Sequence, residues 1–365
     1  MTDTLDVGIP KVQTTKGDLV CYSTLPVRVG VGSDAQVLTA DAASAAGLKW
    51  AAATGGVPST RLVSAGVGLA GGGDLSADRT FTVAIPQING FRLTLTTAVP
   101  VTTADVTGAT TIYLSPYKGG MIALYDGAAW ALYSSAEISV ALGTLTSGLP
   151  YDVFVLQTAG VLSMELLAWT NGTTRATALV LTNGVWLKTG ALTRRYVGTF
   201  YTTSATATED SAAKRFLFNA DNRVPRPWAP ATETADSWTY NTVAWRESNA
   251  NTNNRLQCVI GLSEDAVHIV ARSECFLTSG TSDLFAAGVG VDSTTVNSAQ
   301  VFGSDVTSTE SRWTDEAFYV GTLAVGFHFL SWLERINNAA VGHTFYGDTG
   351  VPTIKQCGIV GVIVT

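Results

Sequence analysis

Most of the chain after Asn89 alternates short apolar runs with Gly, Asn and Asp, a pattern typical of β-strands joined by tight turns. The clearest turn is Asn183 with Gly184, because both accept positive φ and the flanking positions alternate between apolar and other residues. Asp126 with Gly127 predicts a second hairpin. We therefore expect an antiparallel meander, with strands at 111–114, 121–125, 130–133, 151–157, 161–170, 178–182, 185–188 and 196–202.

A second strand-rich block follows a proline cluster. Pro225, Pro227 and Pro230 fix φ and lack amide donors, so we expect sheet pairing to stop there and place a domain boundary near 224–231. Because no helix-length periodic pattern follows, the block favours a β-sandwich of the jelly-roll type. Its strands are predicted at 238–245, 255–262, 267–273, 317–323, 326–333, 341–346 and 358–364.

The four cysteines form no C-x-x-C pair, so neither a zinc site nor a redox motif is indicated. Residues 255–262 and 266–273 are expected to form a hairpin, which would set Cys258 opposite Val270. In that register Cys258 and Cys275 cannot form a disulfide.

Residues 1–88 have a different pattern, because they are rich in Gly, Ala, Asp and Ser and have only short apolar patches. A single copy of such a segment gains little burial for the entropy that it loses on ordering. We expect several copies to supply one another's core, although a disordered linker is also compatible with this composition. The predicted divisions of the chain are 1–88, 89–230 and 231–365.

Composition narrows the possible partners. Of the 365 residues, 46% are hydrophobic and only 14% are charged, so neutral polar groups must cover the surface. Twenty-two Lys and Arg against 29 Asp and Glu give a net charge of −7, which argues against a nucleic-acid partner. The acidic N-terminus lacks the apolar segment of a secretory signal, so we expect cytosolic synthesis. The apolar stretch 318–333 is too short to span a bilayer, and no membrane insertion is expected.

Several short motifs in the first quarter of the chain have a distinctive amino-acid sequence. They are K-G-D-L (16–19), V-G (29–30), Q-V-L-T-A-D (36–41), G-L-K-W (47–50) and G-L-A-G-G-G-D-L-S-A-D-R-T (68–80). These motifs resemble the attachment and shaft regions of tailed-bacteriophage fibres and other virion appendage proteins. The segment K-R-F-L-F-N-A-D-N-R-V-P-R-P (214–227) adds to that resemblance. The resemblance implies a virion location, an extended shaft-like N-terminal region that contacts other virion proteins, and a homotrimer.

The sequence offers little for catalysis. His268, His328 and His343 each lie inside an apolar run, and neither H-E-x-x-H nor G-x-S-x-G occurs. The triple glycine at 71–73 precedes no Lys-Ser/Thr, so a backbone turn explains it better than a phosphate loop. We expect no enzyme, no metal and no cofactor. A carboxylate pair for glycoside hydrolysis stays open, since acidic residues of the predicted loops include Glu264, Asp265, Asp315 and Glu316.

Binding is the better functional candidate, because aromatic and amide side chains on polar loops can stack on sugar rings and bond their hydroxyls. Three polar loops qualify, at 246–255, 305–316 and 347–351. The candidate ligand-binding residues are Trp313, Arg312, Tyr346, Asn251 and Asn253. The guanidinium of Arg312 is expected to donate hydrogen bonds to a glycan next to the Trp313 ring, on which a sugar can stack, unless Trp313 packs beneath its own loop.

These observations favour a structural fibre subunit that displays a C-terminal β domain for attachment to host surface glycans. Two alternatives stay open. One is a head-decorating fibre without a specific receptor, and the other is a polysaccharide-degrading tail protein.

Overall fold

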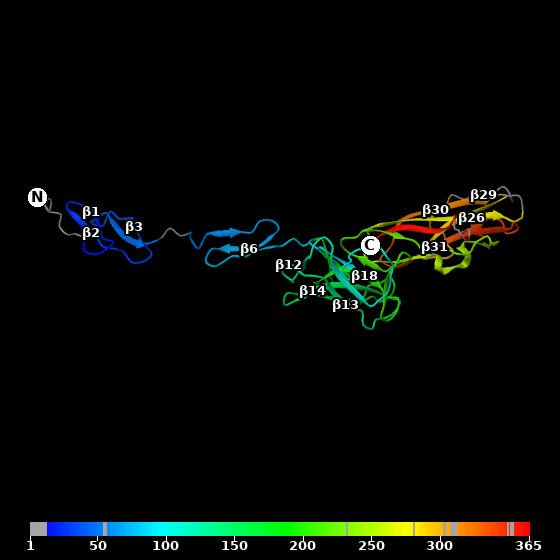
Figure 1. The fold of residues 1–365 in the computed structure, drawn as a ribbon, viewed down its shortest axis with the longest axis horizontal. Coiled ribbons are helices and arrows are strands. Elements are labelled where there is room, and N and C mark those ends of the chain that lie inside the picture. The colour runs from blue at the N-terminus through cyan, green and yellow to red at the C-terminus, as the bar shows by residue number, and fades with distance from the viewer. Residues whose placement is uncertain are drawn as a thin grey trace. The chain divides into compact units, whose positions relative to one another are not determined.

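The computed structural model describes residues 13–53, 57–230, 233–279, 282–301, 304–306, 312–348, 350 and 354–365. In these residues the fold is mainly β, as predicted, with several antiparallel sheets and no α-helix (Figure 1). None of the described segments is a helix that could cross a lipid bilayer. Contacts divide the chain into two compact units, Met1–Phe81 and Thr82–Thr365.

The first unit consists of small separate sheets. β1 (Leu19–Tyr22) pairs with β2 (Pro26–Val29), and β3 (Gln36–Ala40) pairs with β4 (Leu48–Ala52). A three-stranded sheet of β5 (Leu62–Ser64), β6 (Leu69–Asp74) and β7 (Phe81–Val83) follows. Among the described residues up to Phe81, Val29 is the only buried hydrophobic side chain.

A polar centre organises the first hairpin in place of an apolar one. The buried carboxylate of Asp18 accepts hydrogen bonds from the amides of Thr14 and Thr15 at 2.9 and 2.8 Å, and from Arg28 Nε at 2.7 Å. The hydrogen bond from Arg28, together with these backbone amides, holds the pKa of Asp18 well below its usual value, against a smaller opposing effect of burial. Local polar contacts therefore substitute for burial in this unit.

The triple glycine lies within strand β6, so the predicted turn is wrong. Gly71, Gly72 and Gly73 all have positive φ, at 112°, 98° and 130°. A Cβ on Gly72 would lie 2.5 Å from the Val63 carbonyl oxygen on β5. Gly71 and Gly72 are needed because neighbouring backbone carbonyls approach too closely for any side chain.

The second unit begins with a meander. A three-stranded sheet has the order β13 (Ile138–Ala141), β10 (Thr111–Pro116), β8 (Phe91–Thr94), and a hairpin joins β11 (Met121–Tyr125) to β12 (Trp130–Ser134). The third sheet runs β15 (Val161–Ala168), β14 (Pro150–Thr158), β18 (Ala191–Tyr201), β17 (Val185–Lys188), β16 (Leu179–Thr182), with β21 (Leu217–Asn219) paired to β18. Both predicted hairpins are confirmed, and Asn183 and Gly184 have φ of 52° and 80°.

Two larger sheets complete the second unit. The first runs β29 (Ser304–Val306), β27 (Asp283–Val291), β31 (Gly326–Ile336), β25 (Arg255–Ile260), β20 (Lys214–Arg215), β19 (Thr208–Asp210), β9 (Val106–Ala109), with β24 (Arg246–Glu247) on β31. The second runs β22 (Pro225–Trp228), β33 (Gly358–Val364), β26 (Ala266–Leu277), β30 (Arg312–Thr322), β28 (Gln300–Val301), and β32 (His343–Tyr346) joins β26 to β23 (Ser237–Thr239). We call them the β31 sheet and the β26 sheet. They share one core that includes Leu256, Ile269, Val289, Trp332 and Ile359, so they form a sandwich.

The proline cluster does not end sheet pairing. Pro225 and Pro227 belong to β22, which pairs antiparallel with β33 at the edge of the β26 sheet. An edge strand needs hydrogen bonds on one side only, so prolines are tolerated there. They are exposed, whereas Arg226 and Trp228 between and after them are buried. Strands from both sides of 224–231 share sheets, and contacts divide the chain after Phe81 and not at the predicted boundary.

The predicted hairpin between residues 255–262 and 266–273 is wrong. β25 pairs with β31, whereas β26 pairs with β30 and β33 in the opposite sheet. The chain therefore crosses the sandwich between these strands. Cys258 and Cys275 are both buried and free.

Candidate functional site

Two of the predicted ligand residues come together on the outer face of the β26 sheet. The guanidinium of Arg312 lies 3.7 Å from the ring centroid of Tyr346. Glu274, on the intervening strand β26, forms ion pairs with Arg312 at 3.4 Å and with Lys355 at 3.0 Å. Arg312 and Lys355 thus share one carboxylate, which engages the Arg312 guanidinium within the protein.

Trp313 does not share a surface with Arg312. Successive side chains of a strand point to opposite faces, and Trp313 pairs with Cys275, which is buried in the interior. The indole of Trp313 remains 38% exposed at this edge of the sandwich. The expectation that the Arg312 guanidinium lies beside the Trp313 ring on one surface is therefore wrong, although the Trp313 side chain is accessible.

Asn251 has a structural partner. Its Nδ2 donates to the buried carboxylate of Glu233 at 2.9 Å, and its Oδ1 accepts from the Asn253 amide at 3.0 Å. Asn254 Nδ2 donates to the same carboxylate at 2.8 Å. Burial alone would raise the pKa of Glu233, but these hydrogen bonds and one from the Ala235 amide hold the pKa below its ordinary value. The Asn-rich loop is therefore anchored by an ionised, buried carboxylate.

Asn253 lies in a polar cleft of about 610 Å³ on the outer face of the β31 sheet. β9, β19, β20 and β25 supply the cleft floor, and the 3₁₀ turn Thr252–Asn254 supplies one wall. Along these strands, outward positions alternate with buried ones. The cleft side chains with ligand-binding chemistry are Asp105, Glu209, Lys214, Asn253, Arg255 and Gln257.

Lys214, Glu209 and Arg255 form ion pairs, whereas the side-chain amides of the cleft have no partner among the described residues. Lys214 Nζ lies 3.2 Å from a Glu209 oxygen, and Arg255 pairs with Glu247 through a 2.7 Å contact. The side-chain amides of Asn253 and Gln257 form no hydrogen bond with the described part of the protein. Because each amide carries donors and an acceptor, these two groups can bond sugar hydroxyls without breaking an existing contact.

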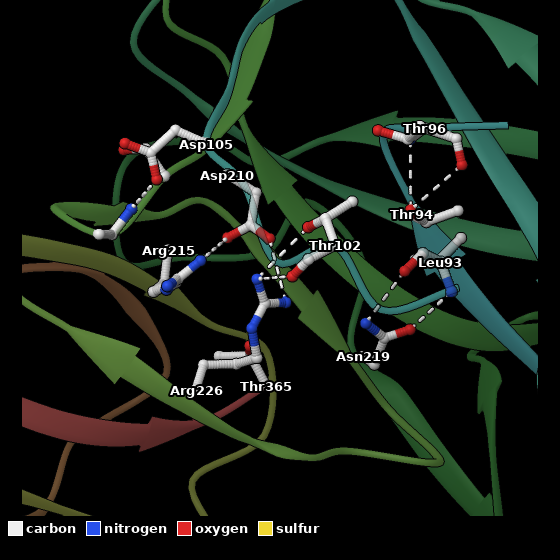
Figure 2. A network of polar contacts seen from close by, with 12 residues as sticks. Leu93, Thr94, Thr96, Thr102, Asp105, Asp210, Arg215, Asn219, Arg226 and Thr365 are labelled. Carbon is white, nitrogen blue, oxygen red and sulfur yellow. Dashed lines mark hydrogen bonds and ion pairs between the residues drawn. The ribbon is translucent and has the colours of Figure 1, made fainter. Parts of the chain in front are cut away.

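A buried polar network lies beneath the cleft, between the two sheets of the sandwich (Figure 2). Asp210 pairs with Arg215 at 3.2 Å on its own sheet and with Arg226 at 3.3 Å on the other. Arg226 also donates to the Thr102 carbonyl at 2.8 Å, and Asp105 accepts from the Ala212 amide at 2.7 Å. These contacts fix the segment before β9 against the β19–β20 turn, and thereby shape the cleft.

Two of the histidines and three of the loop acids that were considered for catalysis are engaged elsewhere, whereas His268 is exposed and neither it nor Glu316 forms a side-chain hydrogen bond or ion pair among the described residues. His328 bonds Asp292 and the Ala324 carbonyl at 2.8 Å each, and His343 lies 3.0 Å from Asp283 in the interior. Arg223 holds both Glu264 and Asp265, while buried Asp315 accepts from the Ala287 amide at 2.7 Å. Within the described ranges, no group of three or more His, Cys, Asp or Glu could hold a metal ion.

Sequence reasoning found Asn253 but missed most of the cleft. Asp105, Glu209, Lys214 and Gln257 come from three distant segments, and strand pairing across both predicted domains brings them together. The one local signal was the alternation in 255–258, where Arg255 and Gln257 flank the apolar Leu256.

Comparisons with known proteins identify no family for this chain. No family model matches the chain, and no curated protein matches it. Among solved structures, one similar chain is described as a crystal structure of a Bacillus thuringiensis Cry1Da tryptic core variant, with 9% identity and a TM-score of 0.17. The match covers 71% of this chain and 48% of that one, so this chain spans about half the length of that structure.

Proposed function

We propose that this protein is the subunit of an oligomeric virion appendage, of the tailed-bacteriophage fibre type, that displays its second unit for attachment to surface glycans. The observation that carries the proposal is the missing core of the first unit. Val29 is its only buried hydrophobic side chain among the described residues, while Tyr22 is 84% exposed. Two-stranded hairpins without a shared core are marginally stable alone, so this unit requires partners.

A homotrimer is the proposed assembly, since identical copies in closed symmetry supply one another's missing core. The motifs at 16–50 and 68–80 support this choice through their resemblance to fibre shafts. Light scattering on the full chain at micromolar concentration should give the mass of three 38.2 kDa copies. A mass of one copy would contradict both the oligomer and the fibre.

The polar cleft is the proposed glycan site. Asn253 and Gln257 offer free amides, and the Glu209–Lys214 pair offers charged hydrogen-bond partners beside them. The probe is an array of purified bacterial capsular and O-antigen polysaccharides. A variant with Asn253→Ala and Gln257→Ala should lose binding to any polysaccharide that the native chain retains. Gln300→Ala, an exposed amide on the other sheet, is the matched control and should bind normally.

Trp313 remains a predicted stacking residue, and the same array tests it. Trp313→Ala should weaken binding by about 1–3 kcal/mol if the indole stacks on a sugar ring. Unchanged binding by Trp313→Ala, together with loss in the cleft variant, would assign recognition to the cleft alone.

The cleft also supports one other function, because it holds two carboxylates, Asp105 and Glu209. Release of reducing ends from a bound polysaccharide would identify a polysaccharide-degrading tail protein and contradict the proposed non-enzymatic role. A trimer that binds no polysaccharide on the array would favour a head-decorating fibre.

A further inference from the structure

The outer face of the β26 sheet carries an apolar patch whose side chains are partly exposed to solvent. Cross-strand pairing aligns two rows of side chains on β33, β26 and β30. The first row consists of Val362, His268 and Val320, and the second row consists of Val360, Val270 and Phe318. We call these six side chains the apolar patch. Val320, Val360 and Val362 are 63%, 54% and 43% exposed, and the patch lines a shallow hollow of about 370 Å³.

Opposite charges border the patch. In the next row of the same face, Arg272 lies opposite Glu316 across β26 and β30. Within the described residues neither side chain forms an ion pair or a side-chain hydrogen bond. The face therefore offers an apolar centre flanked by one unpaired cation and one unpaired anion, so the same face on a neighbouring copy carries a partner for each charge.

The patch is too small to hold a free partner. Exposed Pro227 on β22 extends it by one strand, because Pro227 pairs with Val362. Four strands about 4.8 Å apart and two rows about 7 Å apart cover on the order of 200–300 Å². A stable interface buries about 800 Å² on each partner. Only a partner that is already held nearby can occupy this patch, because tethering replaces the missing contact area with effective concentration.

We propose that the apolar patch packs against a second copy of this chain within the oligomer, and that Arg272 of one copy pairs with Glu316 of the neighbouring copy. The inference rests on the proposed function, because the first unit supplies the tether. It adds a second interface, located on the β26 sheet. The opposite charges favour another copy over an apolar ligand, since a second copy carries one charge of each sign and an apolar ligand carries neither.

Thiol labelling tests this interface in the full chain. Val320→Cys is compared with Val161→Cys, which lies at a 70% exposed position on β15. Both carry Cys21→Ser, because the other three native cysteines are buried. In the oligomer, a maleimide should label position 320 at least about tenfold more slowly than position 161, since reaction requires the interface to open.

The outcomes separate the inference from the proposed function. An oligomer in which both positions react at the same rate would overturn the interface and leave the fibre proposal standing. A single-copy mass by light scattering would overturn both.

A charge test addresses the Arg272–Glu316 pair. When a tagged R272E chain is expressed together with an E316R chain, mixed oligomers should exceed the random proportion, because the altered charges attract only between the two kinds of chain. The strain within each chain is the same in pure and mixed oligomers, so it cannot produce this excess. Random mixing would contradict the proposed pairing.

Discussion

Trp238 donates a 2.8 Å hydrogen bond from its indole nitrogen to Glu334, a carboxylate with no exposed surface near the C-terminal end of β31. Arg246 contacts the same carboxylate at 2.7 Å and lies 3.9 Å from the ring centroid of Tyr240. Burial raises the pKa of Glu334 to about 7, although Arg246 and Trp238 oppose that shift. This cluster connects β23, which pairs with β32 in the β26 sheet, to β24 and β31 of the β31 sheet.

The pKa of Glu334 predicts a pH dependence of stability. Because the folded pKa of about 7 lies above the ordinary 4.5, the folded protein binds more protons than the unfolded chain between these values. The contribution of Glu334 is therefore fully present below about pH 4.5 and is lost as pH rises through about 7. Urea unfolding of native and Glu334→Gln proteins across this range should show the loss in the native protein only. Parallel pH profiles would contradict the prediction.

Trp228 should be essential to the sandwich, although it follows the proline cluster. Its side chain is 1% exposed and lies in the shared core of the two sheets. Trp228→Ala should lower the free energy of unfolding by about 3–5 kcal/mol, as expected for a large buried aromatic. Pro225→Ala, at an exposed position of the same strand, is the control and should change it little. A small effect of Trp228→Ala would indicate that β22 detaches easily from β33.

Asp210 should be far more important to stability than its neighbour Glu209. Asp210→Asn leaves Arg215 and Arg226 buried without their common anion, which should cost about 3–5 kcal/mol. Glu209→Gln removes only the half-exposed pair with Lys214 and should cost less than about 1 kcal/mol. Chemical denaturation of both variants measures the difference. Equal losses would show that the network in Figure 2 contributes nothing beyond a surface pair.

Gly72 should be irreplaceable in the first unit. Its φ of 98° and the nearby Val63 carbonyl oxygen leave no place for a Cβ, so Gly72→Ala should strain the β5–β6 pairing by at least about 1–3 kcal/mol. In the proposed oligomer this strain should reduce the assembled fraction measured by light scattering. Gly66→Ala is the matched control, since no atom lies within 4 Å of its added Cβ. Normal assembly of Gly72→Ala would contradict this role.

The candidate site shows why binding residues are harder to predict than strands. Arg312 and Tyr346 meet because β30 and β32 both pair with β26, yet Trp313 points to the other face of the same strand. Proximity in sequence places two side chains side by side only in a loop, and residues 312 and 313 belong to a strand. Sequence reasoning treated them as a loop because of the polar residues before them.

The sequence by itself determined the features that depend on neighbouring residues. Alternation and turn chemistry predicted the β class and the hairpin at Asn183 and Gly184, because a two-residue turn is decided by which residues accept positive φ. The sparse apolar content before Phe81 likewise predicted a segment without its own core.

Only the tertiary structure decided which strands share a sheet. β25 and β26 are consecutive but lie in opposite sheets, while β20 pairs with β25 across the predicted boundary. The cleft, the buried Asp210 network and the apolar patch all follow from such long-range pairing. The physical reason is that a strand's two edges can hydrogen-bond any other strand, so the choice depends on which apolar faces are buried together, and adjacent residues do not specify it.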